Sequence, residues 1–146
     1  MRKLFIASSL ALLLQPLAAW AGFEEGLAAA EKSNYITALQ HWQPLAAQGH
    51  SASQYNLALM YDNGNGVPRN LERAAYWYRK AAERGYANAQ NSLGAMHESG
   101  EGVPKDLAEA LKWYRLSAAQ GNKSGQRNLE KLQGPRPAVV PSNSSQ

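Results

Sequence analysis

The chain has 146 residues, with 15 Lys and Arg against 11 Asp and Glu, and it contains no cysteine. This length allows one domain, and the lack of cysteine excludes disulfides, thiolate metal sites and a cysteine nucleophile. Basic residues alternate with acidic ones rather than clustering, so the sequence predicts no nucleic-acid-binding surface.

Residues 1–21 have the features of a secretory signal peptide. Arg2 and Lys3 precede an apolar run at 4–14, which is too short for a membrane span of roughly 20 residues. Ala19-Trp20-Ala21 has the small residues that precede a cleavage site. We expect cleavage after Ala21 and a periplasmic or secreted protein that is not embedded in the membrane; an uncleaved anchor helix is the alternative. Without cysteine, a lipoprotein is excluded.

Two consecutive segments, 50–85 and 86–121, are near copies of each other at a spacing of 36 residues. The turn GNGVP at 64–68 falls on GEGVP at 100–104. Self-similarity at a period of 20 to 50 residues is typical of solenoids built from stacked repeats. The other matched positions include Gln54 and Gln90, Leu57 and Leu93, Met60 and Met96, Trp77 and Trp113, and Tyr78 and Tyr114.

Each copy is predicted to form two helices joined by the glycine turn. The first helices are expected at 52–63 and 88–99, because apolar residues recur there at i, i+3 and i+4. Asn70 and Asp106 are good N-caps for the second helices, and Asp106 with Glu109 resembles a capping box. Gly85 and Gly121 follow the last turns as C-terminal caps. The expected packed face of the second helices comprises Leu71, Ala74, Tyr78, Ala81 and Ala82, and in the copy Leu107, Ala110, Leu111, Tyr114 and Ala118.

The flanking segments fit the ends of such a stack. Residues 22–49 read as a degenerate repeat with helices near 23–32 and 34–48, whose connection is four residues shorter than in the full copies. Terminal repeats are atypical because they cap the stack. Residues 122–133 are predicted to form a C-terminal capping helix, and 134–146, which contain three prolines and no periodicity, a disordered tail.

The segments LALMYDNGNGVPRNLERAAYWYRKAAERG and LGAMHESGEGVPKDLAEALKWYRLSAAQG resemble the Sel1-like repeat. Two departures are small: Ala58 replaces the glycine that Gly94 keeps, and His97 replaces the tyrosine seen at Tyr61. The resemblance implies an all-α fold, a right-handed α-solenoid of antiparallel helix pairs related to tetratricopeptide repeats. It also implies a scaffold for protein interactions, without indicating which partner it binds.

Few residues have the type and spacing that phosphate binding, metal binding or catalysis requires. The Gly-x-Gly pairs lack the further glycine and the lysine of a phosphate loop, and His41, His50 and His97 stand in different repeats. We expect neither a metal nor a cofactor. Some cysteine-rich members of the family have been linked to β-lactam binding and hydrolysis, but the Ser-x-x-Lys motif of such enzymes is missing. The prediction is that the protein is not an enzyme, with a β-lactamase-like hydrolase as the third interpretation.

The candidate binding site rests on positions that differ between the two copies, because positions shared by both hold the stack together. On the first helices, the variable positions roughly opposite Leu57 are predicted to line a concave groove for a protein or peptide. The alternative is that they are merely solvated. A second function, binding of cell-wall glycan, would use exposed aromatic residues such as Tyr55 and Tyr76; the oligomeric state stays open. The proposed groove residues are Tyr55, Leu59, Asp62, Asn91, Ala95, Glu98, Arg127 and Lys131.

Overall fold

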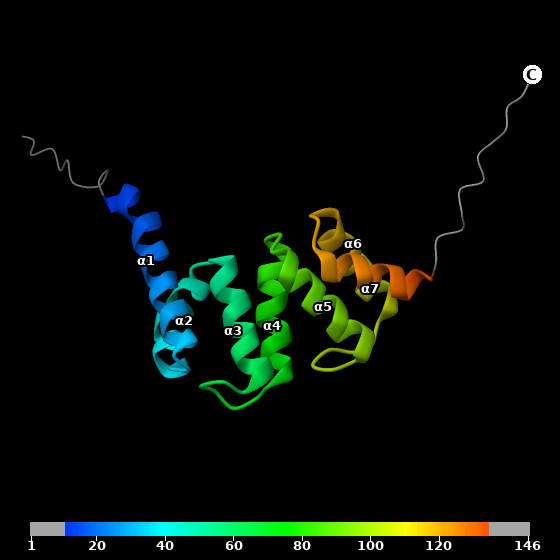
Figure 1. Cartoon of the computed structure of the whole chain (residues 1–146), viewed down its shortest axis with the longest axis horizontal. Coiled ribbons are helices and arrows are strands. Elements are labelled where there is room, and N and C mark those ends of the chain that lie inside the picture. Colours follow the sequence, from blue (N-terminus) through cyan, green and yellow to red (C-terminus); the bar gives the residue numbers. More distant parts are fainter. Residues whose placement is uncertain (1–10, 135–146) are drawn as a thin grey trace, which may run out of the picture.

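A computed structural model describes residues 11–134, so the start of the predicted signal peptide and the predicted disordered tail from 135 onward lie outside it. This part of the chain is all helical (Figure 1). The helices are α1 (Ala11–Glu31), α2 (Tyr35–Ala47), α3 (Ser51–Asn63), α4 (Leu71–Glu83), α5 (Ala87–Ser99), α6 (Leu107–Ala119) and α7 (Lys123–Gln133).

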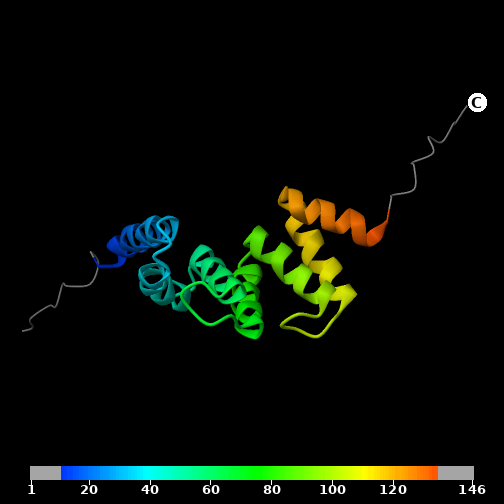
Figure 2. The same ribbon diagram turned by 60° about the horizontal axis from the view of Figure 1, so that its bottom comes forward.

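The helices stack in chain order. Each one packs mainly on its neighbours in sequence, and α5 also contacts α7. Seen from two directions, the helix pairs follow one another along the long axis, and α1 and α7 lie at opposite ends (Figures 1 and 2). The predicted all-α solenoid of helix pairs is therefore confirmed.

Local signals in the sequence set the helix boundaries. Gly64 and Gly100 end α3 and α5 in the left-handed conformation, with φ of 72° and 81°, which glycine adopts without strain. Asn70 caps α4 through a hydrogen bond from the backbone N–H of Arg73. Asp106 caps α6 in the same way, but the expected capping box is incomplete.

Glu109 does not complete that capping box because both possible partners are engaged elsewhere. The backbone N–H of Asp106 donates to the carbonyl of His97 at 2.9 Å. The Glu109 carboxylate instead accepts hydrogen bonds from Trp113 Nε1 and Lys112 Nζ. Glu109 thus stabilises α6 through side chains one turn further along the helix.

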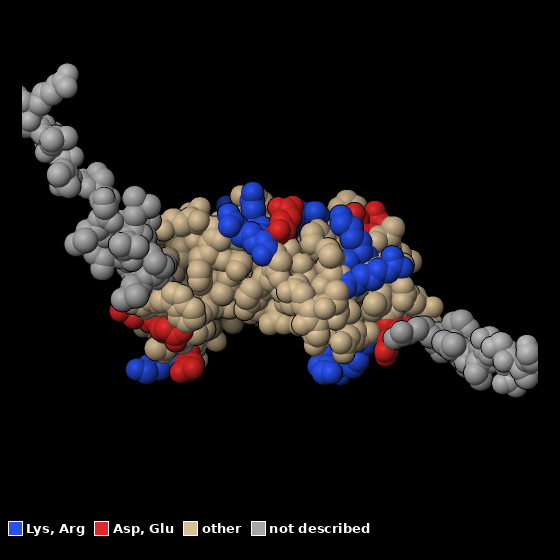
Figure 3. All heavy atoms as spheres, turned by 90° about the horizontal axis from the view of Figure 1, so that it is seen from above, with Lys and Arg blue, Asp and Glu red and all other residues tan. Residues whose placement is uncertain are grey.

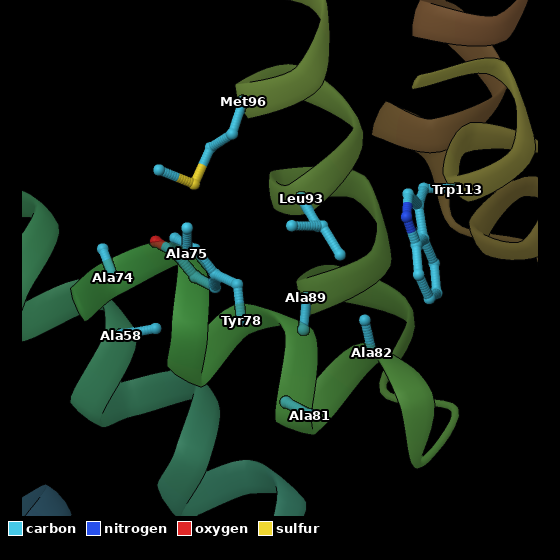
Figure 4. Packing of buried hydrophobic residues seen from close by; sticks show 10 residues of the cluster. All are labelled: Ala58, Ala74, Ala75, Tyr78, Ala81, Ala82, Ala89, Leu93, Met96 and Trp113. Atoms are coloured by element: carbon cyan, nitrogen blue, oxygen red, sulfur yellow. The ribbon is translucent and has the colours of Figure 1, made fainter. Parts of the chain in front are cut away.

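The core consists of aromatic rings set among alanines. Tyr78 and Tyr114 are almost fully buried, at 1% and 0% exposed. Figure 4 shows Tyr78 with small side chains of α4 and α5 around it, and Trp113 of α6 on the far side of Leu93. Alanine allows helices to approach closely, while the aromatic rings supply most of the buried apolar area. The second helices therefore bury the face that the sequence predicted, with Leu71, Leu111 and Ala118 only partly buried and Leu107 exposed.

Two buried glutamines join successive repeats. Gln54 Nε2 donates to the carbonyl of Ala46 at 3.0 Å, and Gln90 Nε2 donates to the carbonyl of Ala82 at 3.2 Å. In each case the first helix of one repeat bonds to the end of the preceding second helix. A buried amide needs such a partner, which explains why both copies keep glutamine at this position.

Two features differ from the sequence prediction. Helix α1 begins at Ala11 rather than near residue 23, so the predicted cleavage site after Ala21 lies within a continuous helix. Leu107 was expected on the packed face but is 47% exposed, whereas its counterpart Leu71 is half-buried. Leu71 is covered by the glycine turn of the next repeat, and within residues 11–134 no further turn follows α6 and α7.

Candidate functional site

Two hollows lie at equivalent places between successive first helices. The first hollow, of about 190 Å³, lies between the α1–α2 pair and α3, and the second, of about 310 Å³, lies between the α3–α4 pair and α5. Their linings correspond across the 36-residue period. The matched pairs are Tyr35 and Leu71, Asn56 and Ser92, Leu59 and Ala95, Met60 and Met96, Asn63 and Ser99, and Asn65 and Glu101.

The hollows combine an apolar floor with polar side chains that can form hydrogen bonds. In the first hollow, the amides of Asn56, Asn63 and Asn65 lie beside Leu59 and Met60. Carboxamides donate and accept, so they can pair with peptide N–H and C=O groups. The second hollow is more acidic, since its lining includes Asp62 and Glu101 beside Ala95 and Met96.

Asp62 and Glu98, both candidate groove residues, also hold the helix pairs together. Tyr78 Oη donates to Asp62 Oδ2 at 3.0 Å, and Tyr114 Oη donates to Glu98 Oε2 at 2.6 Å. Burial, together with these carboxylates, raises the pKa of both tyrosines far above the ordinary value. The hydrogen bond from Tyr114 is the main cause that lowers the pKa of Glu98. The same contact therefore recurs in both full repeats.

Tyr55 was predicted to lie opposite the packed face, but in the structure it packs against two other tyrosines. Its ring centroid is 5.0 Å from that of Tyr86 and 5.7 Å from that of Tyr78, and burial is the main cause that raises its pKa. The prediction placed one packed face on each first helix. In the stack, α3 packs on α2 and also on α4, so a residue turned away from one neighbour meets the other.

The candidate residues near the C-terminal end are partly brought together by the contact between α5 and α7. Asn128 Nδ2 donates to Asn91 Oδ1 at 2.9 Å, and Lys131 Nζ donates to Glu98 Oε1 at 3.4 Å. Arg127 remains exposed and bonds only within α7, to Ser124 at 3.4 Å. Asp62, Asn91 and Ala95 line the second hollow, and Leu59 lines the first.

A third hollow, of about 720 Å³, lies on the side formed by α2 and α4. Tyr76 is 54% exposed there, and its ring packs edge-on against Trp77 at 5.0 Å. The guanidinium of Arg73 lies 5.5 Å from the centre of the Tyr61 ring. This hollow is wide and open. Cations lie over two of its aromatic rings, with Arg73 over Tyr61 and Lys80 over Tyr76.

The comparison with protein families agrees with the repeat geometry. The model of the Sel1 repeat matches residues 17–50, 51–86 and 87–122, one match for each helix pair. The chain belongs to the Sel1 repeat family. A comparison with curated proteins gives no match.

Solved Sel1 repeat structures share the fold. A Sel1 repeat protein from Oxalobacter formigenes is 37% identical, with a TM-score of 0.72 over 75% of this chain and 45% of that one. A protective antigen of uropathogenic Escherichia coli strains is also 37% identical, with a TM-score of 0.73 over 85% of this chain and 28% of that one. The chain thus spans less than half the length of either. Cysteine-rich protein B of Helicobacter pylori is 20% identical, with a TM-score of 0.67 over 78% and 90% of the two chains, and shows the fold alone.

Several lining residues of the Sel1 repeat hollows were missed by sequence reasoning, among them Asn56, Asn63, Asn65 and Glu101. The signal was present, because each differs from its counterpart in the other full repeat. The predicted groove included only those variable positions that lie roughly opposite Leu57 on the first helices. The hollows instead open between adjacent first helices, so their lining comes from a neighbouring stripe of α3 and α5 and from the glycine turns.

The described residues of this Sel1 repeat protein show no group of three or more His, Asp or Glu side chains that could hold a metal ion. None of the helices within residues 11–134 is long and apolar enough to cross a bilayer. On the face shown in Figure 3, Lys and Arg side chains stand beside Asp and Glu rather than forming one continuous basic surface. Nucleic-acid binding usually relies on such a surface.

Proposed function

We propose that this Sel1 repeat protein is a non-catalytic scaffold that binds a segment of another protein in its two inter-repeat hollows. Sel1 repeat folds are typically protein-interaction scaffolds. The observation that carries the proposal is the recurrence of the hollow at the same repeat positions with a changed lining. The buried tyrosines and glutamines that hold the stack are kept in both full repeats, while the lining is free to suit a partner.

The chemistry of the hollows favours a peptide segment with exposed backbone groups. Asn56 and Asn63 offer amides on one helix face, two turns apart, and Ser92 and Ser99 occupy the same positions in the next repeat. Such side chains can hydrogen-bond peptide groups, while Leu59 and Met96 supply apolar contact. The acidic second hollow favours a basic residue at that point of the segment, because Asp62 and Glu101 lie at its edge.

We expect Ala95→Arg to abolish capture of the partner, because the long side chain fills the second hollow and places a positive charge where the partner would lie. Ala119→Arg is the matched control, since Ala119 is an exposed alanine at the end of α6. The measurement is affinity capture from an envelope extract of the producing cell, with each variant as bait. Both variants should keep wild-type helicity by circular dichroism. Equal capture by the two variants would refute binding in the second hollow.

Glycan binding is the second candidate function, and it rests on the hollow between α2 and α4. Exposed Tyr76 and half-buried Trp77 there could stack against sugar rings, and Gln43 and Glu72 could bond hydroxyl groups. Tyr55, the other aromatic residue considered for this role, is packed between tyrosines. If glycan binding is the function, cell-wall fragments should change the tryptophan fluorescence of the wild type and of Ala95→Arg, but not of Tyr76→Ala.

We also propose export, with cleavage after Ala21 and a periplasmic or secreted product. The packing of residues 20–31 of α1 supports this, because the described side chains that are buried there follow the cut. Phe23 packs against the rings of Trp42 and His50, and its carbonyl accepts a hydrogen bond from Trp42 Nε1 at 3.3 Å. Trp20, before the cut, is 65% exposed. The intact mass of the secreted or periplasmic protein should correspond to a chain starting at Gly22; retention of residues 1–21 would contradict the proposal.

A further inference from the structure

Each full repeat carries a carboxylate in the last turn of its first helix, and the tyrosine of the second helix binds it. Asp62 Oδ2 accepts a hydrogen bond from Tyr78 at 3.0 Å, and Glu98 Oε2 accepts one from Tyr114 at 2.6 Å. In both repeats the tyrosine engages one carboxylate oxygen. The other oxygen is left for a second partner.

The second oxygen of Glu98 is paired with a lysine of the next first helix. Lys131 Nζ of α7 donates to Glu98 Oε1 at 3.4 Å. Lys131 follows Ala95 by 36 residues, just as Glu98 follows Asp62. An alanine of α5 thus stands beside Asp62 at the repeat position where α7 has the lysine. Within residues 11–134, no hydrogen bond or ion pair engages the second oxygen of Asp62.

The second hollow lies where that lysine side chain is missing. Asp62 and Ala95 both line it, Ala95 is exposed, and Glu101 adds another carboxylate to the lining. We propose that the second hollow is a site for a lysine side chain of the partner segment, whose ammonium group pairs with Asp62 as Lys131 pairs with Glu98. An ammonium group offers three donors and no acceptor, which suits a carboxylate. This inference rests on the proposed function and names the partner residue that the hollow accepts.

The first hollow offers no carboxylate to such a lysine. Ala30 takes the position of Asp62 once the four residues missing from the first repeat are allowed for, and it lines the first hollow. Leu59 takes the position of Ala95. The described residues of this lining include asparagines but neither Asp nor Glu. The lysine therefore distinguishes the two hollows. Because an exposed ion pair contributes little binding energy, it fixes the register of the segment more than it tightens binding.

Zero-length coupling by a water-soluble carbodiimide tests the geometry without a partner. The reagent joins an amine to a carboxylate in contact with it, with loss of one water, and mass spectrometry of the digest identifies the joined pair. In the full chain, Lys131 should be joined to Glu98, which serves as the internal positive control. Ala95→Lys should add a bond between the introduced lysine and Asp62. Ala119→Lys, at the exposed end of α6, is the matched control and should give no bond to Asp62.

If the lysine introduced by Ala95→Lys is not joined to Asp62 while Lys131 is joined to Glu98, the lysine site is overturned. Capture of a partner by the wild type would then still stand, because this measurement involves no partner. The two proposals can therefore fail separately.

The second measurement applies the same coupling to the wild type after capture from the envelope extract. Asp62 should be joined to a lysine of the captured protein. Ala95→Lys should lower the yield of this adduct at least several-fold, because its own lysine occupies the hollow. Adducts that avoid Asp62, or an equal yield from Ala95→Lys, would overturn the lysine site. A wild type that captures no protein at all would refute the proposed function, and the lysine site with it.

Discussion

Tyr114→Ala is expected to destabilise the protein by about 3–5 kcal/mol, the cost typical of removing a large buried ring. Tyr114 is 0% exposed, and its ring lies against Gly94, where an added Cβ would touch it. Removal of the ring leaves a cavity between α5 and α6 that the rigid backbone fills only partly. A domain with a total stability of about 5–15 kcal/mol would lose a large share of it.

Urea unfolding followed by circular dichroism measures this effect, with Leu116→Ala as the control on the same helix. Leu116 is 43% exposed, so its truncation should cost about 0.5 kcal/mol or less. Tyr114→Phe separates the hydroxyl from the ring, and should cost about 1–2 kcal/mol through the hydrogen bond to Glu98. Equal costs for Tyr114→Ala and Leu116→Ala would show that the ring is not a core element.

The Tyr114–Glu98 contact also gives the stability a dependence on pH. Because the hydrogen bond lowers the pKa of Glu98 in the folded state, the unfolded state binds the proton more readily. The contribution is therefore fully present above the unfolded pKa of about 4.3 and is lost as pH falls through the lower folded value. In Tyr114→Phe the loss of folding stability caused by protonation of Glu98 at acid pH should be smaller. It should not vanish, because Lys131 also lowers the pKa of Glu98.

Gly102→Ala is expected to cost about 2–5 kcal/mol, much more than Gly121→Ala at about 1–2 kcal/mol. Both glycines have positive φ, 73° and 82°, so both variants bear the strain of a left-handed alanine. At Gly121 the added Cβ meets open space, whereas at Gly102 it meets the backbone carbonyl of Leu71. A carbonyl in the first turn of α4 cannot rotate aside as a flexible side chain can.

The difference between the two unfolding free energies isolates the contact of the turn with α4. Thermal and urea unfolding of the two variants against wild type would measure it. If both variants cost the same, the turn that contains Gly102 does not press on Leu71.

The fold could be predicted from the sequence because each structural signal occurs in both full repeats. A spacing of 36 residues relates the two glycine turns, the N-caps Asn70 and Asp106, and the aromatic pairs. A helix predicted in one repeat was therefore supported by the same pattern in the other. Exposure at the ends of the stack was less predictable. Leu107 copies Leu71 in the sequence, but burial of Leu71 depends on a turn from the following repeat.

The candidate groove was only partly predictable, for a geometric reason. Helical periodicity separates two faces of one helix, but it does not show how many neighbours that helix has. Tyr55 was variable and was therefore placed in the groove, yet it packs against Tyr86, which begins the next repeat. Ala95 and Asp62 do line the second hollow. The amides of the first hollow required knowledge of how α3 is rotated against α1 and α2.

Site-specific photocrosslinking in the producing cell would show whether a protein partner occupies the second hollow. A photoreactive amino acid at Ala95 would lie inside the hollow, and the same probe at Ala119 would lie on the exposed end of α6. We expect one discrete adduct from position 95 only, and we expect it to be lost when Glu101→Lys reverses a charge at the edge of the hollow. Equal adducts from both positions, or none from position 95 in a well-expressed folded variant, would mean that no partner occupies the second hollow.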